Sequence, residues 1–350
     1  MNKTLYILIL TLTVAFTAAC SKHTTDPLQH NTTSGSYIFF QPKIMEGVET
    51  RANTVPFTGD KYGVIGYVGT TPIFTGYTNN IAEVKKNGSL YVYDKLAQWK
   101  DATSTHNFYA FYPYDQTIGT NENTPYIQYI QPKNLTGMID IMTAKTSTSK
   151  GDVTNGLVTL NFTHRLWALD IKVKNSQSKD VVTNPEGTSV TVEPNLYITG
   201  AKIHIYGYRK AGDISIADNK VSGDNVKATI DEVLTYDLFT SSSATPQLQV
   251  SKGETKTFDQ LLFLPVNNSI EYRLEINFKN AWGASYDYYY PSPAMNEEGN
   301  MVYGYKNIDK NFLAGYRYSL EVEKIDAAGI FNINWDVNDW TEVDVDHTFN

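Results

Sequence analysis

The sequence predicts an all-β protein from three observations. Aromatic residues make up 13% of the 350 residues, with tyrosine alone at 25 positions, and strands favour such residues. Short apolar segments bounded by Gly, Asn, Pro or Asp recur along the chain, as strands and turns require. No long stretch repeats its apolar residues at helical spacing. Because 350 residues exceed what one compact core usually holds, we expect two domains.

Residues 1–19 are predicted to be a lipoprotein signal peptide. A positive start ending at Lys3 precedes the apolar run Leu5–Phe16, which is too short to span a bilayer comfortably. The small residues 17–19 lead to Cys20, the only cysteine, so an intrachain disulfide is impossible. This order resembles a bacterial lipobox, in which Cys20 is acylated and becomes the first mature residue. The alternative is plain secretion with an incidental cysteine.

Residues 20–35 are expected to form a polar tether. The segment contains a proline and shows no apolar period, which is typical of a flexible connection. The folded part should therefore begin near Ser36.

Residues 36–180 are expected to form an N-terminal β-sandwich domain. Its candidate strands are Tyr37–Phe40, Tyr62–Val68, Ser89–Tyr93, Asn107–Tyr112, Leu157–Phe162 and Trp167–Lys174. The polar segment 175–195, which contains two prolines, marks the expected boundary between the domains.

Residues 181–350 are expected to form the C-terminal β-sandwich domain. Its candidate strands are Leu196–Tyr208, Leu261–Val266, Tyr272–Phe278, Tyr286–Tyr290, Tyr316–Glu323 and a final stretch, FNINWDVN. In this last stretch four apolar residues alternate with polar ones, so one face is apolar. These four residues are Phe331, Ile333, Trp335 and Val337.

Composition and motifs argue against nucleic-acid binding and against enzymatic activity. The formal net charge is −8 and no long basic stretch occurs, so nucleic acid is a poor partner. A G-x-S-x-G elbow, a phosphate loop and a dinucleotide fingerprint are all absent from the sequence. The six histidines are scattered, with no pair at metal-ligand spacing. We therefore expect no cofactor and no metal.

His164 has two interpretations. As a general base it would pair with a carboxylate such as Asp170, but a backbone hydrogen bond near a strand start is the simpler interpretation, because no nucleophile lies nearby in the sequence. Asp60 and Asp140 are typical of turns. Tyr288–Tyr290 could stack on sugar rings or pack within a sheet. Two alternative functions follow: a monomeric glycan-binding surface lipoprotein, and a β-sandwich hydrolase.

Five segments, in this order and spacing, resemble fimbrillin-like proteins, the lipoprotein pilins and fimbrial accessory subunits of Bacteroidales bacteria. They are FTGDKYGVIGYV (57–68), FYAFYPYD (108–115), DIMTAKT (140–146), NFTHRLWALDIKV (161–173) and NFLAGYRYSLEVE (311–323). The resemblance implies two consecutive transthyretin-like β-sandwich domains. It also implies a surface-exposed outer-membrane lipoprotein whose partners are other fimbrial subunits, with a host surface or glycan as a further partner.

The resemblance implies a processing site at the Arg51–Ala52 bond. In many related pilins a trypsin-like or arginine-specific protease cuts in a loop after the first strand, and here the bond follows the strand-like SYIFFQPKI (36–44). Removing a strand exposes unpaired N–H and C=O groups and an apolar floor, which another chain's strand can cover. The alternative is that Arg51 stays uncut, as in relatives that keep the first strand.

FNINWDVN is the candidate donor strand, because its alternating apolar side chains suit such a groove. Burying each of them would contribute about 1.5–3 kcal/mol. An equally good interpretation makes it the permanent last strand of its own domain. We therefore expect a non-enzymatic fimbrial subunit that polymerises by strand donation and mediates adhesion.

Overall fold

The computed structural model describes residues 36–45, 54–121, 124–177, 180–183, 187, 189–192, 194–218, 220–222, 232–242, 247–267, 269–279, 285–324 and 331–339. Regular structure in this part is strand, apart from three 3₁₀ turns, η1 (Thr78–Asn80), η2 (Leu135–Gly137) and η3 (Lys150–Asp152). The all-β prediction is therefore confirmed. None of the helical turns in the described ranges has the length and apolarity needed to cross a membrane.

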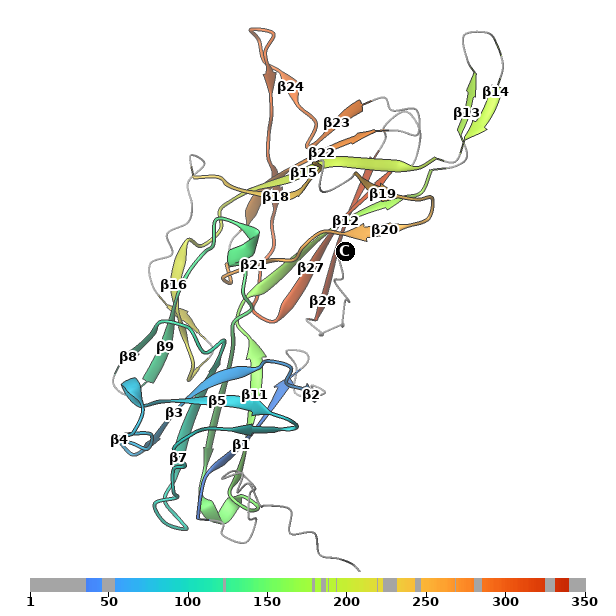
Figure 1. The fold of residues 1–350 in the computed structure, drawn as a ribbon. Coiled ribbons are helices and arrows are strands. Elements are labelled where there is room, and N and C mark those ends of the chain that lie inside the picture. The colour runs from blue at the N-terminus through green and yellow to red at the C-terminus, as the bar shows by residue number, and fades with distance from the viewer. Residues whose placement is uncertain are drawn as a thin grey trace, which may run out of the picture.

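The N-terminal half is a nine-stranded sheet that curls around its own core (Figure 1). Its order is β2-β1-β11-β10-β7-β3-β5-β6, with β4 added to β3. The strands are β1 (Phe39–Met45), β2 (Thr54–Pro56), β3 (Lys61–Val68), β4 (Thr71–Pro72), β5 (Ile81–Asn87), β6 (Leu90–Val92), β7 (His106–Tyr112), β10 (Met142–Thr148) and β11 (Leu157–His164). Because β1 contacts β6 across the core, the two ends of the order come together.

Aromatic rings fill the N-terminal core. Phe40 of β1 lies edge-on to Phe108 of β7 with ring centroids 5.4 Å apart, and Phe57 stacks on Phe162 of β11 at 4.9 Å. Such pairs contribute about 0.5–1.5 kcal/mol beyond the burial of their area. β1 is therefore part of the core, although it lies near one end of the strand order.

The C-terminal half is built from two sheets that face each other across a second core. The first has the order β20-β12-β27-β28 with β21 beside β12, and the second has the order β18-β15-β22-β23 with β19 and β26 added. The strands of the first are β12 (Trp167–Asn175), β20 (Thr255–Thr257), β21 (Leu261–Phe263), β27 (Tyr316–Lys324) and β28 (Phe331–Asp339). The strands of the second are β15 (Leu196–Tyr206), β18 (Leu234–Thr240), β19 (Leu248–Val250), β22 (Ile270–Lys279), β23 (Ser285–Tyr290) and β26 (Lys306–Ile308).

Trp167 is the largest of the described side chains in the second core. Its ring stacks on Phe263 with centroids 4.7 Å apart and lies 4.5 Å from the ring of Phe312. Its indole Nε1–H donates to the carbonyl of Leu264 at 2.9 Å, so the one polar atom of the buried ring is satisfied.

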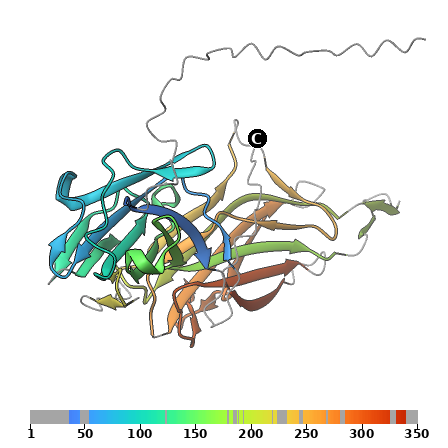
Figure 2. The same cartoon turned by 90° about the horizontal axis from the view of Figure 1, so that it is seen from below.

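A small sheet joins the two halves. Its order is β17-β16-β9-β8, from strands β8 (Ile118–Asn121), β9 (Thr124–Ile130), β16 (Ala211–Ser215) and β17 (Val221–Ser222). Because β9 precedes β11 and β16 follows β15, this sheet pairs strands from both halves (Figure 2). Beside it, the Gln131 side chain donates to the carbonyl of Leu262 at 2.8 Å, and the Tyr236 hydroxyl donates to that of Pro132 at 2.6 Å.

The chain passes from the first core to the second between β11 and β12. The expected division between residues 180 and 181 falls after β12, most of whose buried apolar side chains belong to the C-terminal core. The polar segment 175–195 instead contains a projecting hairpin of β13 (Asp180–Thr183) and β14 (Ser189–Val192) (Figure 1).

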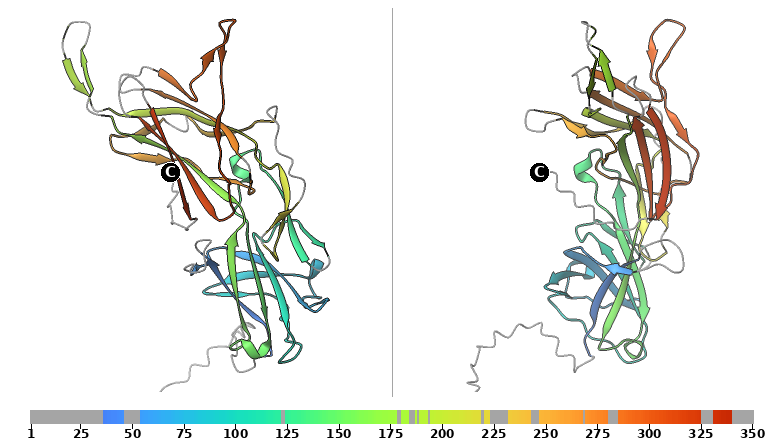
Figure 3. Two further views of the ribbon diagram at one scale, coloured as in Figure 1. Left: turned by 180° about the vertical axis from the view of Figure 1, so that it is seen from behind. Right: turned by 90° about the vertical axis from the view of Figure 1, so that its right-hand side faces the viewer.

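The molecule is elongated, with β1 toward one end. The hairpin of β24 (Ala294–Met295) and β25 (Met301–Val302) projects at the opposite end, as the two views of Figure 3 show. A surface on the C-terminal sheets near that hairpin therefore lies far from the start of the folded chain.

Candidate functional site: the first strand and the hollow beside it

β1 is inserted into the N-terminal half by alternate side chains. Ile38, Phe40, Pro42 and Ile44 are buried, whereas Gln41 between them is exposed. This period of two is what a strand with one core-facing side requires. The local sequence IFFQPKI therefore fixes which face of β1 packs on the core.

One edge of β1 pairs in parallel with β11. The register runs from Phe39 opposite Leu157 to Ile44 opposite Phe162. At the start of this pairing, the Phe39 N–H donates to the carbonyl of Gly156 at 2.9 Å. Gly156 has φ +74°, and a Cβ placed there would lie 2.2 Å from the carbonyl oxygen of Tyr37. Only glycine fits this close approach of the two backbones without displacement.

In the described part of the chain, the other edge of β1 is paired at its two ends. At the start, the Ile38 N–H donates to the carbonyl of Ala97 at 2.9 Å. At the end, residues Lys43–Met45 pair with β2. Opposite Phe40–Pro42, no strand within the described ranges pairs with this edge. Pro42 suits such a position because it has no N–H to leave unpaired.

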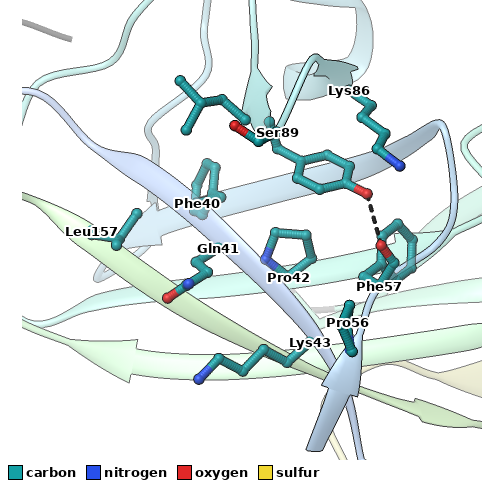
Figure 4. A pocket seen from close by; sticks show the side chains of 11 residues that line it. Phe40, Gln41, Pro42, Lys43, Pro56, Phe57, Lys86, Ser89 and Leu157 are labelled. Atoms are coloured by element: carbon teal, nitrogen blue, oxygen red, sulfur yellow. Dashed lines mark hydrogen bonds between the residues drawn. The ribbon is translucent and has the colours of Figure 1, made fainter.

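A hollow of about 480 Å³ lies along this uncovered edge (Figure 4). Its lining is largely apolar, with two lysines among the contributing residues. Tyr91 of β6 forms one wall, and its hydroxyl lies 3.0 Å from the carbonyl oxygens of both Phe57 and Gly59. The lining residues are Phe40, Gln41, Pro42, Lys43, Pro56, Phe57, Lys86, Ser89, Leu90, Tyr91 and Leu157. A backbone edge beside an apolar hollow can accept another extended segment.

The predicted processing and lipidation residues lie outside the described part of the chain. Arg51 and Ala52 belong to residues 46–53, between the end of β1 at Met45 and the start of β2 at Thr54. Cys20 lies in residues 1–35. The chain link between β1 and the remainder of the fold therefore contains Arg51.

The candidate donor strand is β28, and it pairs with β27 of its own chain. The register sets Ile333 opposite Val322 and Val337 opposite Tyr318. The Ile333 side chain is half-buried against the C-terminal core, while that of Val337 is exposed. The side chains of Phe331 and Trp335 lie outside the described set. β1 and β28 are thus in different halves of the molecule. The structure therefore does not bring the predicted first strand and the predicted donor strand together.

His164 does not form the pair with Asp170 considered from the sequence. Its Nδ1 lies 2.7 Å from a carboxylate oxygen of Asp140, whereas Asp170 pairs with the Arg317 guanidinium at 2.5 Å. Next to His164, the buried Arg165 guanidinium donates to Thr143, and burial lowers the pKa of Arg165 to about 10. His164 and Arg165 lie where the chain crosses from β11 to β12. Their contacts with Asp140 and Thr143 compensate the cost of burying polar groups at this junction.

The tyrosine run is divided between the two faces of β23. Tyr288 and Tyr290 pack partly buried against the C-terminal core. Tyr289 lies on the opposite face, because neighbouring side chains alternate along a strand. The three rings therefore do not form one sugar-stacking platform. Among the described residues, no group of three or more His, Cys, Asp or Glu side chains could hold a metal ion.

Sequence reasoning missed Gly156 and Tyr91, which hold the start of β1 and cover the hollow. The dipeptide Asn155–Gly156 is a recognisable turn signal. Its contact with Tyr37 could not be foreseen, because parallel pairing joins segments more than 100 residues apart.

Comparisons with known proteins give one matching family and several similar solved structures. The sequence model of the fimbrillin-like family matches residues 50–340. A crystal structure of a fimbrial protein from Bacteroides vulgatus is 15% identical, with a TM-score of 0.57, over 87% of this chain and 100% of that one. A proposed cell adhesion protein from Bacteroides uniformis is 18% identical, with a TM-score of 0.48, over 88% and 100%. A search of curated proteins found no match.

Proposed function

This chain belongs to the fimbrillin-like family, and from that membership we propose that it is a subunit of a cell-surface fimbria that assembles by strand exchange at β1. One observation carries this proposal. β1 is a core-forming strand with a partly uncovered edge, and its only covalent link to the rest of the fold is the segment that contains Arg51.

In this proposal the chain first reaches the outer membrane as a lipoprotein. Cys20 carries the acyl chains, and residues 20–35 hold the fold away from the membrane surface. Each buried lipid CH₂ contributes about 0.8 kcal/mol, so more than one acyl chain gives stable anchoring.

Cleavage after Arg51 then converts a covalent attachment into a non-covalent one. The fragment that ends at Arg51 contains the lipid, the tether and β1. Its departure uncovers the edge of β11 and the space that Ile38, Phe40 and Ile44 fill. Each of these apolar side chains is worth about 1.5–3 kcal/mol of burial. An incoming strand with the same alternation recovers that burial and the ladder of hydrogen bonds.

The incoming strand is supplied by another subunit, and β28 is the candidate in this chain. Among the described strands, β28 lies at the end of its sheet, paired on one side with β27. Its described apolar side chains are incompletely buried in place, with Ile333 half-buried and Val337 exposed. Transfer into a vacated groove would bury them further, which is the driving force for donation over retention. Adhesion is the biological outcome that we infer. Strand exchange requires no enzymatic activity other than cleavage by a separate protease.

Limited proteolysis tests this proposal. Purified uncut chain is treated with a low dose of trypsin, and the products are run unheated on SDS gels. We expect cleavage after Arg51, release of the N-terminal fragment, and a ladder of oligomers. Arg51→Ala should abolish cleavage and ladder together. Arg51→Lys is the matched control, because trypsin still cuts after lysine. A ladder that forms equally from the Arg51→Ala protein would contradict strand exchange after processing.

A further inference from the structure

The outer face of the sheet β18-β15-β22-β23 has an unusual composition. Alternate residues of β22 are buried, so Glu271, Arg273 and Glu275 point away from the core. Tyr206 of β15 and Tyr289 of β23 are paired with Glu271 and Glu275 on that same face. The segment before β26 adds two more rings. We call the set Tyr206, Arg273, Tyr289, Tyr303 and Tyr305 the tyrosine face.

Arg273 is the centre of the tyrosine face. Its guanidinium carbon lies 5.6 Å from the ring centroid of Tyr303 and 5.3 Å from that of Tyr305, within cation–π range. Tyr303 contacts Tyr289 with centroids 4.8 Å apart, and Tyr305 contacts Tyr206 at 4.7 Å. The four rings thus form two pairs held by one guanidinium. Rings fixed before a ligand arrives lose little conformational entropy on binding.

Charge on this face disfavours an anionic ligand. Two of the cations have carboxylate partners: Arg273 lies 3.1 Å from Glu275, and Lys202 lies 3.2 Å from Asp237. Lys279, at the far end of β22, is a third cation on this face. Two further carboxylates are satisfied by neutral donors, since the Tyr206 hydroxyl donates to Glu271 and the Asn277 amide donates to Asp287. Around Arg273, the two carboxylates of Glu271 and Glu275 outnumber the one guanidinium, so this part of the face has an excess of negative charge and of hydrogen-bond acceptors. Burial, and then Arg273, lower the pKa of His204, which favours its neutral form.

The face is also open and carries exposed apolar surface. Tyr303 is 38% exposed, although its ring contacts both Tyr289 and Arg273. The hairpin directly before it exposes Met295, Met301 and Val302. Contiguous exposed apolar groups of this kind mark interaction surfaces. Figure 3 places this hairpin at the end of the molecule remote from β1.

We propose that the tyrosine face binds a neutral oligosaccharide. Tyrosine rings with carboxylates beside them match a pyranose, whose C–H face is apolar and whose hydroxyls donate hydrogen bonds. The excess of carboxylates repels uronic acids and sulfated sugars, and Arg273 repels an amino sugar from the ring faces that it covers. This binding needs neither cleavage after Arg51 nor strand exchange.

The test measures sugar binding by the uncut mature chain, residues 20–350, with Cys20→Ala to remove the lipid. Saturation-transfer NMR and titration calorimetry are run with cellohexaose, maltohexaose and mannohexaose as neutral probes. Hexagalacturonate and the chitosan hexamer serve as the anionic and cationic probes. We expect at least one neutral probe to bind, and Tyr303→Ala to weaken it by about tenfold or more, or 1.4 kcal/mol. Tyr303→Phe should bind within about twofold of the parent, since the ring face is kept.

Tyr286→Ala is the matched control. Tyr286 is 41% exposed and also belongs to this sheet, but its ring stacks on Phe278 of the core, on the other face of β23. Its removal should leave sugar affinity within about twofold. The proposal is overturned if none of the three neutral probes binds, if a charged probe binds more tightly than all of them, or if Tyr286→Ala and Tyr303→Ala weaken binding equally. A protein partner captured by this face with no sugar binding would also overturn it.

Discussion

Replacing Gly156 with alanine should loosen β1 without altering any side chain of the strand itself. Gly156 has φ +74°, and the new Cβ would lie 2.2 Å from the Tyr37 carbonyl oxygen. That oxygen accepts from the Trp99 indole at 3.1 Å, and the Gly156 carbonyl accepts from the Phe39 N–H at 2.9 Å. The clash is with backbone, so Tyr37 must move and both hydrogen bonds are disturbed.

The expected cost has two parts that a second variant separates. An alanine in the left-handed region costs about 1–2 kcal/mol wherever it is placed. Leaving a buried donor unpaired costs a further 1–3 kcal/mol or so. Gly88, also preceded by asparagine, has φ +61° and nothing within 4 Å of a built Cβ. Gly88→Ala therefore pays only the first part, and the difference between the two variants should be about 2 kcal/mol.

Hydrogen exchange followed by mass spectrometry measures this difference in β1 itself. A local loss of 2 kcal/mol lowers the protection of residues 36–45 by about 30-fold relative to Gly88→Ala. Peptides from β12 in the other core should change little in either variant. Equal protection of β1 in the two variants would refute the backbone contact on which this reasoning rests.

Four further predictions concern β1, its surroundings and the anchor. Phe40→Ala should lower the free energy of unfolding by about 3–5 kcal/mol, seen as a lower urea midpoint, because the ring is buried against Phe108. Tyr93→Phe should cost about 1 kcal/mol in the same assay, since the buried hydroxyl donates to the carbonyl of Ile38 at 2.7 Å. Hydrogen bonds from the Ser104 hydroxyl and, second, from its backbone N–H hold the pKa of Asp101 below its ordinary value of 3.8. The contribution of Asp101 to stability is therefore present above pH 3.8 and is lost as the pH falls below that value. Asp101→Asn should flatten the acid limb of a stability-against-pH curve, and an unchanged limb would contradict this. Cys20→Ala should move the protein out of the membrane fraction, and a variant that stays there would contradict acylation.

Local patterns predicted the strands of eight or more residues but missed several of seven, such as β9 and β10. Runs such as Asn107–Tyr112 and Tyr272–Phe278 became β7 and β22 with small shifts at their ends, because composition and alternation are properties of the segment itself. Which core a strand joins is not a local property. Trp167 follows β11 by three residues and could not be assigned to the C-terminal core from its neighbours.

Pairings between distant segments could not be predicted from the sequence, because they too are not local properties. In the sequence, the carboxylate nearest to His164 is that of Asp170. In the fold, the histidine instead contacts Asp140, 24 residues earlier, and Asp170 pairs with Arg317. Tyr288–Tyr290 are divided between two faces because neighbouring side chains of β23 point to opposite sides of the sheet. This division could be predicted as soon as the segment was known to be a strand. Its outer-face partner Tyr303 comes from after the β24–β25 hairpin, a contact set by tertiary structure.

Assembly by strand exchange requires that β1 leaves and that a strand from another subunit takes its place. The most direct measurement is N-terminal sequencing of this protein recovered from polymers on the cell surface. If strand exchange follows processing, the polymerised chain begins at Ala52, and residues 20–51 are left in the membrane fraction. Polymers whose chains all begin at acylated Cys20, with β1 still attached, would contradict it.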